Sequence, residues 1–396
     1  MALDENSTQP LTVSIVGAGM AGLTAAISLR RNGHIVEIFE TSEIKTEVGA
    51  ALGVQSNALH VLEYLGVKKE NLKGVSYDGN VLFNSKSGEA TTKPWLVNQS
   101  GRGLLCHRND VYEELKRQAT GEGEGPPAKL RLGNKVIGCD TENGASAIRT
   151  NVIGYTQEAP ASNWSCFRAV FDASKLQGTP EFAWLTDGIS GARSITEKEE
   201  GPLRMLFFYP CRSGSLINFV GLYPDYHQDD PGQYWSSAGT REELIEHFKD
   251  FHPKFLRVLD VMENPLLKWQ LRALPLLPTC CTCHLPFLGQ GAAIAIEEAG
   301  ALGCLFPAGT RREDIPARLE VYQVLRKERG ERINKESVAQ AADPSKRGTY
   351  LNCESQLTFT YSFLYHSTAQ ELQSFIFEYD AIRAAQQCYQ EHFGRD

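Results

Sequence analysis

Residues 12–40, TVSIVGAGMAGLTAAISLRRNGHIVEIFE, decide the fold of this chain. A short β-rich run over residues 12–16 leads into a glycine-rich turn, and the turn leads into a helix predicted over residues 20–32 and closed by Gly33. A second strand is predicted over residues 35–39. A strand, a glycine-rich turn, a helix and a second strand in this order form the unit that binds a dinucleotide.

Three glycines in G-x-G-x-x-G spacing, Gly17, Gly19 and Gly22, give the turn its chemistry. The first permits the tight turn, the second leaves room for a pyrophosphate, and the third lets helix and strand pack closely. The helix N-terminus presents free N–H groups and the positive end of its dipole to the phosphates. Glu40 ends the second strand, where it can accept hydrogen bonds from an adenosine ribose, and its charge disfavours a 2′-phosphate. The pattern leaves open whether the dinucleotide is FAD or NAD.

The composition of the chain indicates an ordinary globular protein. Its 396 residues, 42% hydrophobic and 22% charged, are enough for one or two closely packed domains. A net charge of −8 gives no reason to expect a nucleic-acid partner. No apolar run has the length of a membrane span, and the start MALDENSTQP lacks a secretory signal pattern. We therefore expect a cytoplasmic protein whose ten cysteines are thiols.

The rest of the chain alternates predicted helices with two strand-rich regions. Residues 164–223 contain alternating and aromatic runs such as SCFRAVF and SLINFVGLYP, which predict an antiparallel sheet. Residues 72–98 have weak strand signals and predict an inserted β-hairpin, and the Gly- and Pro-rich residues 121–129 predict a surface loop. Helices are predicted after the caps Ser56 and Asn109, and over residues 244–261, 313–341 and 368–393.

The order of these motifs resembles that of the single-component FAD-dependent aromatic monooxygenases, the salicylate-hydroxylase-like group common in fungi. The segments that carry the resemblance are GAGMAGL, VEIFE, VGAALGVQSNALHVLEYLG, LLCHRNDVYEEL, SCFRA and PFLGQGAAIAIEEAGAL. It implies an α/β fold, in which a Rossmann-like FAD-binding domain is interleaved with an antiparallel β-sheet substrate domain and followed by C-terminal helices. The FAD-binding domain is expected over residues 1–72, 99–155 and 272–345, the sheet domain over 73–98 and 156–271, and the C-terminal helical segment over 346–396.

The resemblance implies FAD as cofactor and NAD(P)H as co-substrate, and it assigns roles to particular residues. Gly17, Gly19 and Gly22 would hold the pyrophosphate and Glu40 the ribose. Gly53 would approach the cofactor through its backbone, and Arg108 would contact the diphosphate or the ribityl chain. A helix opens at the flavin edge, where its N-terminus stabilises the negative charge of reduced flavin; the residues expected there are Gly289, Gly291 and Ala292.

Arg168 in SCFRA and Tyr209 in FFYPCR are the candidates for catalysis, because the resemblance places these strands against the flavin. A guanidinium can bind a substrate carboxylate or stabilise a phenolate, and a tyrosine hydroxyl can orient or deprotonate a phenol. The alternative is structural: Arg168 pairs with an acid and Tyr209 belongs to the core. Arg212 is a weaker candidate, and His107 is expected to be a packed or solvent-touching histidine rather than a base.

The chain departs from the family pattern at two motifs. The Ala-Asp-Gly-Ile-x-Ser-x-x-Arg motif survives only as ENGASAIRTNVIG, with Ser146 and Arg149 in register, and TDGISGARS at 186–194 is expected to be a loop of the sheet domain. Thr279 stands where the family has the aspartate of Gly-Asp, and no apolar strand precedes it. The CCTCH run at 280–284 lacks the second ligand pair of a closed zinc site, so no metal site is predicted.

The activity that the resemblance implies is FAD-dependent monooxygenation with NAD(P)H and O2. One oxygen atom would be transferred to a small aromatic or polyketide-like substrate, of the kind made in secondary metabolism, by hydroxylation or epoxidation. Two alternatives stay open: a flavin oxidoreductase without oxygen insertion, and a non-catalytic relative that lacks the Gly-Asp motif. The partner expected is the small-molecule aromatic substrate, with no nucleic acid and no membrane span.

Overall fold

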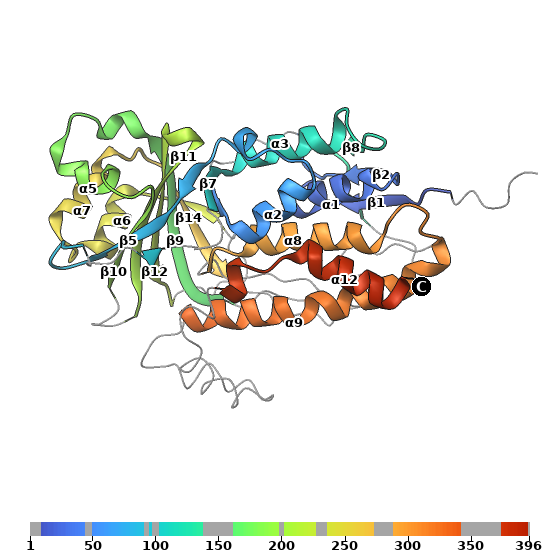
Figure 1. The fold of residues 1–396 in the computed structure, drawn as a ribbon. Helices are drawn as coiled ribbons and strands as arrows, with labels where there is room; N and C mark the ends of the chain where they lie inside the picture. Colours follow the sequence, from blue (N-terminus) through green and yellow to red (C-terminus); the bar gives the residue numbers. More distant parts are fainter. Residues whose placement is uncertain are drawn as a thin grey trace, which may run out of the picture.

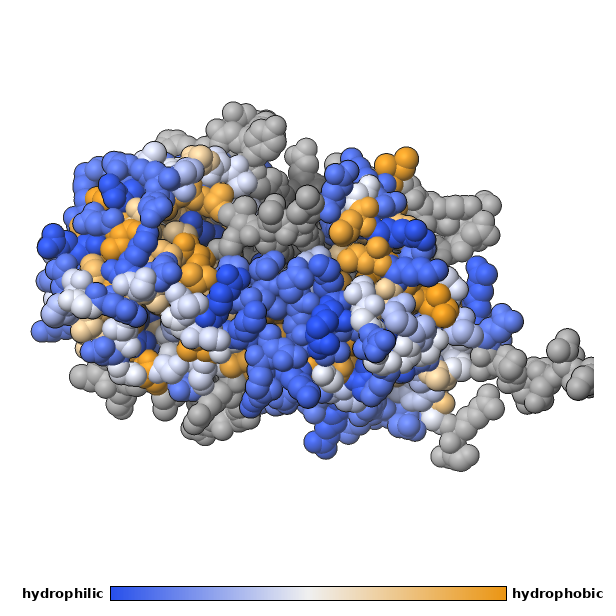
Figure 2. Space-filling view, turned by 90° about the horizontal axis from the view of Figure 1, so that it is seen from above, coloured by the Kyte–Doolittle hydropathy of each residue, from blue (hydrophilic) through white to orange (hydrophobic). Residues whose placement is uncertain are grey.

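The computed structural model describes residues 9–43, 50–90, 95–96, 103–137, 161–197, 202–226, 236–272, 288–341 and 374–394. Two parts lie side by side: a large twisted sheet with short helices on its outer face, and a helical part built around two small sheets (Figure 1). Seen from above, a band of hydrophilic residues crosses the middle of the molecule, and hydrophobic residues are scattered on both sides of it (Figure 2). The boundaries of the predicted domains stay predictions.

The predicted dinucleotide-binding unit is present. It consists of β1 (Thr12–Val16), α1 (Met20–Arg31) and β2 (Ile35–Phe39), and its two strands are parallel. The helix ends within one residue of the prediction, and Gly33 has φ of +84°, the left-handed conformation that commonly closes a helix. A third strand, β8 (Lys129–Arg131), pairs with β2 in parallel.

Strand β1 lies at an edge of this sheet. Among the described residues β2 is the only strand that pairs with it, and the apolar residues Val16 and Ile35 are each 40% exposed. An exposed edge here agrees with the sequence, in which no apolar strand precedes Thr279.

A second small sheet leads toward the large one. Its strands are antiparallel, in the order β3-β7-β4. Helices from both ends of the chain pack with α1 in the core of this part, where the buried residues include Leu23, Ile27, Leu62, Leu115 and Ile296. The elements are β3 (Ala51–Val54), α2 (Ser56–Tyr64), β4 (Val75–Tyr77), β7 (Gly103–His107), α3 (Arg108–Thr120) and α8 (Gly291–Leu305).

The large sheet has eight strands in the order β13-β14-β9-β12-β11-β10-β5-β6, and all neighbours are antiparallel except β10 and β5, which are parallel. The β-hairpin predicted over residues 72–98 is confirmed in part: β5 and β6 pair in antiparallel, whereas β4, at the start of this region, pairs with β7 of the small sheet. The strands are β5 (Gly79–Asn84), β6 (Trp95–Leu96), β9 (Ala161–Asp172), β10 (Gly191–Glu197), β11 (Arg204–Cys211), β12 (Leu216–Pro224), β13 (Ser236–Gly239) and β14 (Leu266–Arg272).

The two faces of this sheet differ. Its outer face is covered by α5 (Ala183–Thr186), α6 (Arg241–Phe248) and α7 (Pro253–Leu256), which bury an aromatic core that includes Phe167 and Phe208 (Figure 1). The inner face is turned toward the helical part. The single helix predicted over residues 244–261 is wrong: it is broken before Pro253, which begins α7, and a 3₁₀ turn follows over Arg257–Val261.

The C-terminal region supplies two antiparallel helices below α8 (Figure 1). The helix α9 (Ile315–Ala341) begins two residues later than predicted. The helix predicted over residues 368–393 is partly wrong, because the described part is broken and α12 (Ala381–Phe393) starts only after Asp380, whose side chain accepts a hydrogen bond from the Arg383 amide. Within the described residues no helix is long and apolar enough to cross a membrane.

A buried ion cluster joins α8, α9 and the chain before α12. Both arginines Arg326 and Arg329 donate to the carboxylate of Glu297, at 2.6–2.7 Å. Arg329 also donates to the backbone carbonyls of residues 375–376. Burial by itself would raise the pKa of Glu297, but the two guanidinium groups outweigh it and lower that pKa. The carboxylate therefore stays ionised inside the protein.

Candidate active site

The glycine-rich turn has the geometry that its sequence predicts. Gly17 has φ of +97°, and its N–H donates to the carbonyl of Phe39 at 2.8 Å. A Cβ at Gly22 would lie 2.0 Å from the carbonyl oxygen of Gly17, whereas a Cβ at Gly19 would meet nothing within 4 Å. Gly22 therefore serves the packing of helix on strand, and Gly19 leaves open space in front of the helix N-terminus.

Glu40 is tied to this turn. One carboxylate oxygen accepts the N–H of Ala18 at 2.8 Å, and the other accepts the N–H of Ser42 at 3.1 Å. Each carboxylate oxygen has a second lone pair, so the group can still accept a hydrogen bond from a ribose hydroxyl.

Gly53 and Arg108 lie on neighbouring elements. Gly53 is on β3, and Arg108 is the exposed first residue of α3, with its backbone N–H bonded to the carbonyl of Ala50 at 3.0 Å. The prediction that Asn109 caps α3 is wrong, because the N-cap is His107, whose side chain makes no capping hydrogen bond. His107 is buried, and its Nδ1 lies 2.9 Å from a guanidinium nitrogen of Arg212, which confirms a packed histidine.

The helix α8 presents an open N-terminus. Gly289 has φ of +62°, and a Cβ at Gly289 or Gly291 would meet nothing within 4 Å. Ala292 lies in the first turn of α8. The N-cap Gln290 is buried; its Oε1 accepts a hydrogen bond from Asn57 at 3.0 Å, and its Nε2 has no partner within the described residues.

These residues fit FAD. Two helix N-termini, those of α1 and α8, are free of side chains that would block a ligand, and a buried amide donor lies unpaired at the second. Phosphate oxygens suit the first, and the electron-rich flavin edge suits the second. Thr279, Ser146, Arg149 and the CCTCH run lie outside the described residues; within these, no cluster of His, Cys, Asp and Glu has the geometry of a metal site.

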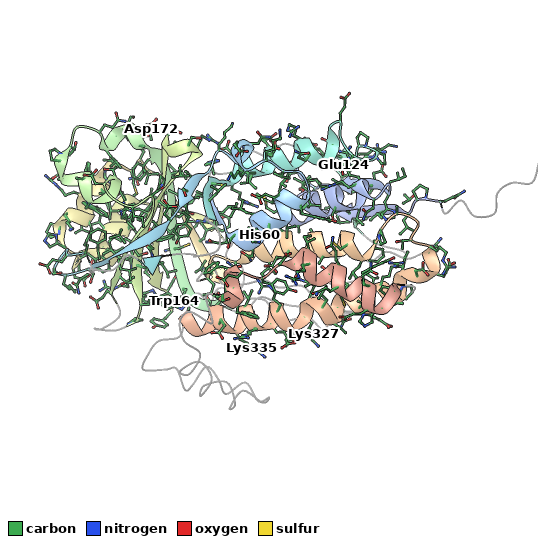
Figure 3. All side chains as sticks on the ribbon, in the orientation of Figure 1. His60, Glu124, Trp164, Asp172, Lys327 and Lys335 are labelled. Atoms are coloured by element: carbon green, nitrogen blue, oxygen red, sulfur yellow. The ribbon has the colours of Figure 1, made fainter. Side chains whose placement is uncertain are left out.

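Arg168 and Tyr209 lie on the inner face of the large sheet. On β9, Trp164 lies at the foot of the sheet and Asp172 at its top (Figure 3). Arg168 is four residues from each of them along this strand. Arg168 lies between Val220 and Leu267 on the adjacent strands, and its buried Nε has no hydrogen-bond partner in the described part of the chain. An arginine that is half-buried among apolar neighbours and unpaired at Nε can bind an anionic oxygen.

Tyr209 is buried in an apolar cluster, and its protonation follows from that position. Burial raises the pKa of the Tyr209 hydroxyl, and the positive charge of Arg168 offsets only part of this rise. The hydroxyl is therefore protonated at neutral pH, which suits a hydrogen-bond donor and not a base.

Two other arginines are held by the protein itself. Arg212 donates to Asp110 at 2.9 Å and contacts His107, so it belongs to a structural ion pair. Arg193, in the TDGISGARS stretch, is buried on β10 and donates to four backbone carbonyls, among them those of Trp184 and Asp187. The prediction of a loop at 186–194 holds only for residues 187–190, because Thr186 ends α5 and residues from Gly191 onward form β10.

Sequence reasoning missed Asn218. This residue lies on β12 directly opposite Tyr209, is fully buried, and accepts the N–H of Ala51 on β3 at 2.9 Å. The only signal in the sequence is a single polar residue inside the apolar run SLINFVGLYP.

Comparison with known proteins identifies the family. The model of an NAD(P)-binding Rossmann-like domain matches residues 15–44. Hispidin-3-hydroxylase of Neonothopanus nambi is 35% identical to this chain, over 89% of this chain and 92% of its own length. The chain belongs to the FAD-dependent monooxygenases. FAD is therefore the cofactor of this enzyme, and the predicted α/β fold class is confirmed.

More distant members of this monooxygenase family agree. The 3-hydroxybenzoate 6-hydroxylase of Polaromonas naphthalenivorans is 26% identical over 82% of this chain and 85% of its own length. A salicylate hydroxylase in a substrate complex has the same fold, with a TM-score of 0.71 and 19% identity over 96% of this chain and 98% of its own. The alignment with the hispidin hydroxylase runs over 403 positions, more than this whole monooxygenase chain contains, so the relative carries residues that have no counterpart here.

Proposed function

We propose that this enzyme uses NAD(P)H and O2 to hydroxylate a small aromatic substrate whose ring carries an acidic hydroxyl group, with epoxidation of an alkene as the other outcome of the same chemistry. The observation that carries the proposal is Arg168, which is half-buried on the sheet face that is turned toward the FAD-binding part and whose Nε has no partner among the described residues. The names of the hispidin and 3-hydroxybenzoate hydroxylases support a phenolic substrate. NADH and NADPH both remain candidates.

Arg168 and Tyr209 have different roles in the proposed reaction. When bound, FAD would supply the electron transfer from NAD(P)H and the activation of O2, from which one oxygen atom goes to the substrate. Arg168 binds the phenolic oxygen and favours its anionic form, because a positive charge in apolar surroundings lowers the pKa of a nearby phenol. Tyr209, which stays protonated, donates a hydrogen bond that orients the ring. An ionised phenol pushes electrons into the ring and makes it more reactive toward an electrophilic oxygen.

The residues that we propose to bind FAD lie at the glycine-rich turn, at Glu40 and at the N-terminus of α8. Gly17, Gly19 and Gly22 are proposed to hold the pyrophosphate and Glu40 the ribose, with Gly53 and Arg108 flanking the cofactor. The N-terminus of α8, formed by Gly289, Gly291 and Ala292, is proposed to stabilise the anionic edge of reduced flavin.

The first experiment is the visible absorption spectrum of the purified enzyme before and after incubation with FAD and desalting. Retained flavin bands are expected. A folded, colourless protein would show that the departures at Thr279 and at residues 142–154 abolish cofactor binding in this chain.

The second experiment tests Arg168 with a panel of phenols that includes hispidin and 3-hydroxybenzoate. Arg168→Met is expected to lower kcat/KM for NAD(P)H-dependent hydroxylation roughly 10- to 100-fold, because a charge-assisted hydrogen bond is lost, with little change in Tm. Arg193→Met is the control and should lower Tm, since it leaves four carbonyls without their donor. NAD(P)H oxidation without any hydroxylated product from the wild type would favour a flavin oxidoreductase that inserts no oxygen.

A further inference from the structure

Asn218 occupies the centre of the inner sheet face. It is opposite Tyr209 on β11 and opposite Val170 on β9, and Arg168 is two residues from Val170. Because successive residues of a strand point to opposite faces, Arg168, Tyr209 and Asn218 share one face on three adjacent strands. Asn218 thus lies between the two candidate catalytic residues.

One atom of Asn218 joins the two parts of the molecule. Its Oδ1 accepts the backbone N–H of Ala51, the first residue of β3, at 2.9 Å. The same strand carries Gly53, and the preceding residue, Ala50, accepts the N–H of Arg108. A buried hydrogen bond therefore connects β12 of the substrate sheet with β3, the strand that carries Gly53.

The other end of the Asn218 amide is unused. Its Nδ2 is buried and has no partner within the described residues. A buried donor without a partner reduces stability. The sheet satisfies its other buried amide: Asn80 donates to the Ser194 hydroxyl at 2.8 Å and accepts from it at 3.2 Å. Asn218 therefore gives the Ala51 N–H an uncharged hydrogen-bond acceptor, while its own Nδ2 has no partner among the described residues.

We propose that Asn218 is a positioning residue that holds the substrate sheet at a fixed distance from the flavin through Ala51. This inference rests on the proposed function, because the distance between the sheet and the flavin matters for the hydroxylation proposed there. In the coupled reaction, NAD(P)H, a proton, O2 and the phenol give NAD(P)⁺, the hydroxylated phenol and water. When the ring is out of place, NAD(P)H, a proton and O2 give NAD(P)⁺ and H2O2, and the phenol is unchanged.

The test compares Asn218→Ala, Asn218→Asp and the control Asn80→Ala in the FAD-loaded enzyme, with hispidin and 3-hydroxybenzoate as probes. Asn218→Ala removes the acceptor, and we expect at least a threefold rise in H2O2 formed per NAD(P)H, with less than a twofold change in the Kd for FAD. Asn218→Asp keeps an acceptor for Ala51 and should restore coupling. Asn80→Ala should lower Tm without raising H2O2.

A second readout needs no substrate. Hydrogen exchange of the peptide that contains Ala51 should be at least tenfold faster in Asn218→Ala than in the wild type or in Asn80→Ala, because the Ala51 N–H loses its acceptor. Unchanged exchange, or uncoupling as large in Asn80→Ala as in Asn218→Ala, would overturn the proposal. If the wild type hydroxylates neither probe, the proposed function fails for these compounds, and hydrogen exchange alone decides on the contact to Ala51.

Discussion

Three arginines of the large sheet are chemically alike but differ in position: Arg168 lies on the inner face, Arg193 lies on the outer face opposite Phe208, and Arg212 lies in the turn after β11. Arg193 is bound by backbone carbonyls and Arg212 by Asp110, so both guanidinium groups already have partners within the protein. Arg168 has apolar residues on both neighbouring strands and a buried Nε without a partner in the described residues. An unpaired cation in a site of low dielectric attracts an anion more strongly than an exposed one does.

Tyr209 allows a prediction at the same scale. Its pKa is raised by burial, so the hydroxyl is neutral through the whole range in which the enzyme is assayed. Tyr209→Phe should lower kcat/KM by roughly tenfold, the effect of one lost hydrogen bond, and leave the pH dependence between pH 6 and 9 unchanged in shape. Loss of an ionisation from the pH–rate profile of the variant would contradict this, since it would show that Tyr209 acts as a base.

At the scale of elements, two glycines of the strand–turn–helix unit have different roles. Gly22 is required by the close approach of α1 to the carbonyl of Gly17, whereas Gly19 borders open space. The first role belongs to folding and the second to the ligand. The helix α8 repeats the second role at Gly289 and Gly291.

A pair of matched substitutions distinguishes these roles. Gly22→Ala places a methyl group 2.0 Å from a carbonyl oxygen, so the enzyme should lose several °C in Tm or fail to fold. Gly19→Ala has room for the methyl group in the absence of FAD, and its backbone has φ of −78°, which alanine adopts readily. Its Tm without FAD should be unchanged, and its Kd for FAD should rise at least tenfold. Equal losses of Tm in both variants would refute the assignment.

At the scale of the whole molecule, contacts between residues far apart in the chain hold the two parts together. Glu297 on α8 binds Arg326 and Arg329 on α9, and Arg329 in turn binds the carbonyls of residues 375–376. Residues 376 and 377 belong to the same apolar cluster as Tyr209 and Ala51. The ion cluster thus stabilises a C-terminal segment that packs beside the active site.

Glu297→Gln should destabilise the enzyme by about 3–5 kcal/mol, because it leaves two buried guanidinium groups without their carboxylate. The exposed Glu328→Gln is the control and should change the free energy of unfolding by less than about 0.5 kcal/mol. Urea denaturation of both variants measures the difference. The pKa of Glu297 is lowered in the folded state, so its contribution to stability is present at neutral pH and is lost as the pH falls toward that pKa.

Three buried thiols are expected to lower the free energy of unfolding at high pH. Burial raises the pKa of Cys106 and Cys211 to about 12 and that of Cys166 to about 11, above the ordinary value of 9.0. The folded thiols stay neutral while the unfolded ones ionise, so the free energy of unfolding should fall as the pH rises above 9, by up to about 1.4 kcal/mol per thiol per pH unit. Urea midpoints between pH 8 and 11 measure this loss. Cys106→Ala should reduce the slope, and a flat profile would contradict the prediction.

The sequence by itself determined the local units, because strand, turn and helix signals act over a few residues. The glycine spacing predicted the turn at Gly17, and Gly33 predicted the end of α1. The family followed from several such units in order. Where neighbours in space decide, the sequence failed: within residues 72–98 only β5 and β6 form the predicted hairpin, since β4 pairs with β7 of another sheet, and Asn109 is not the cap of α3.

Only the tertiary structure decided which polar residues are available for chemistry. Arg168, Arg193 and Arg212 cannot be told apart in the sequence. In the structure, carbonyls of the preceding turn hold Arg193 and Asp110, 102 positions away, holds Arg212, whereas the Nε of Arg168 has no partner among the described residues. Asn218 is a single polar residue in an apolar strand until Ala51, 167 positions away, is placed against it. Hydrogen bonding and burial depend on these long-range contacts, so local patterns do not predict them.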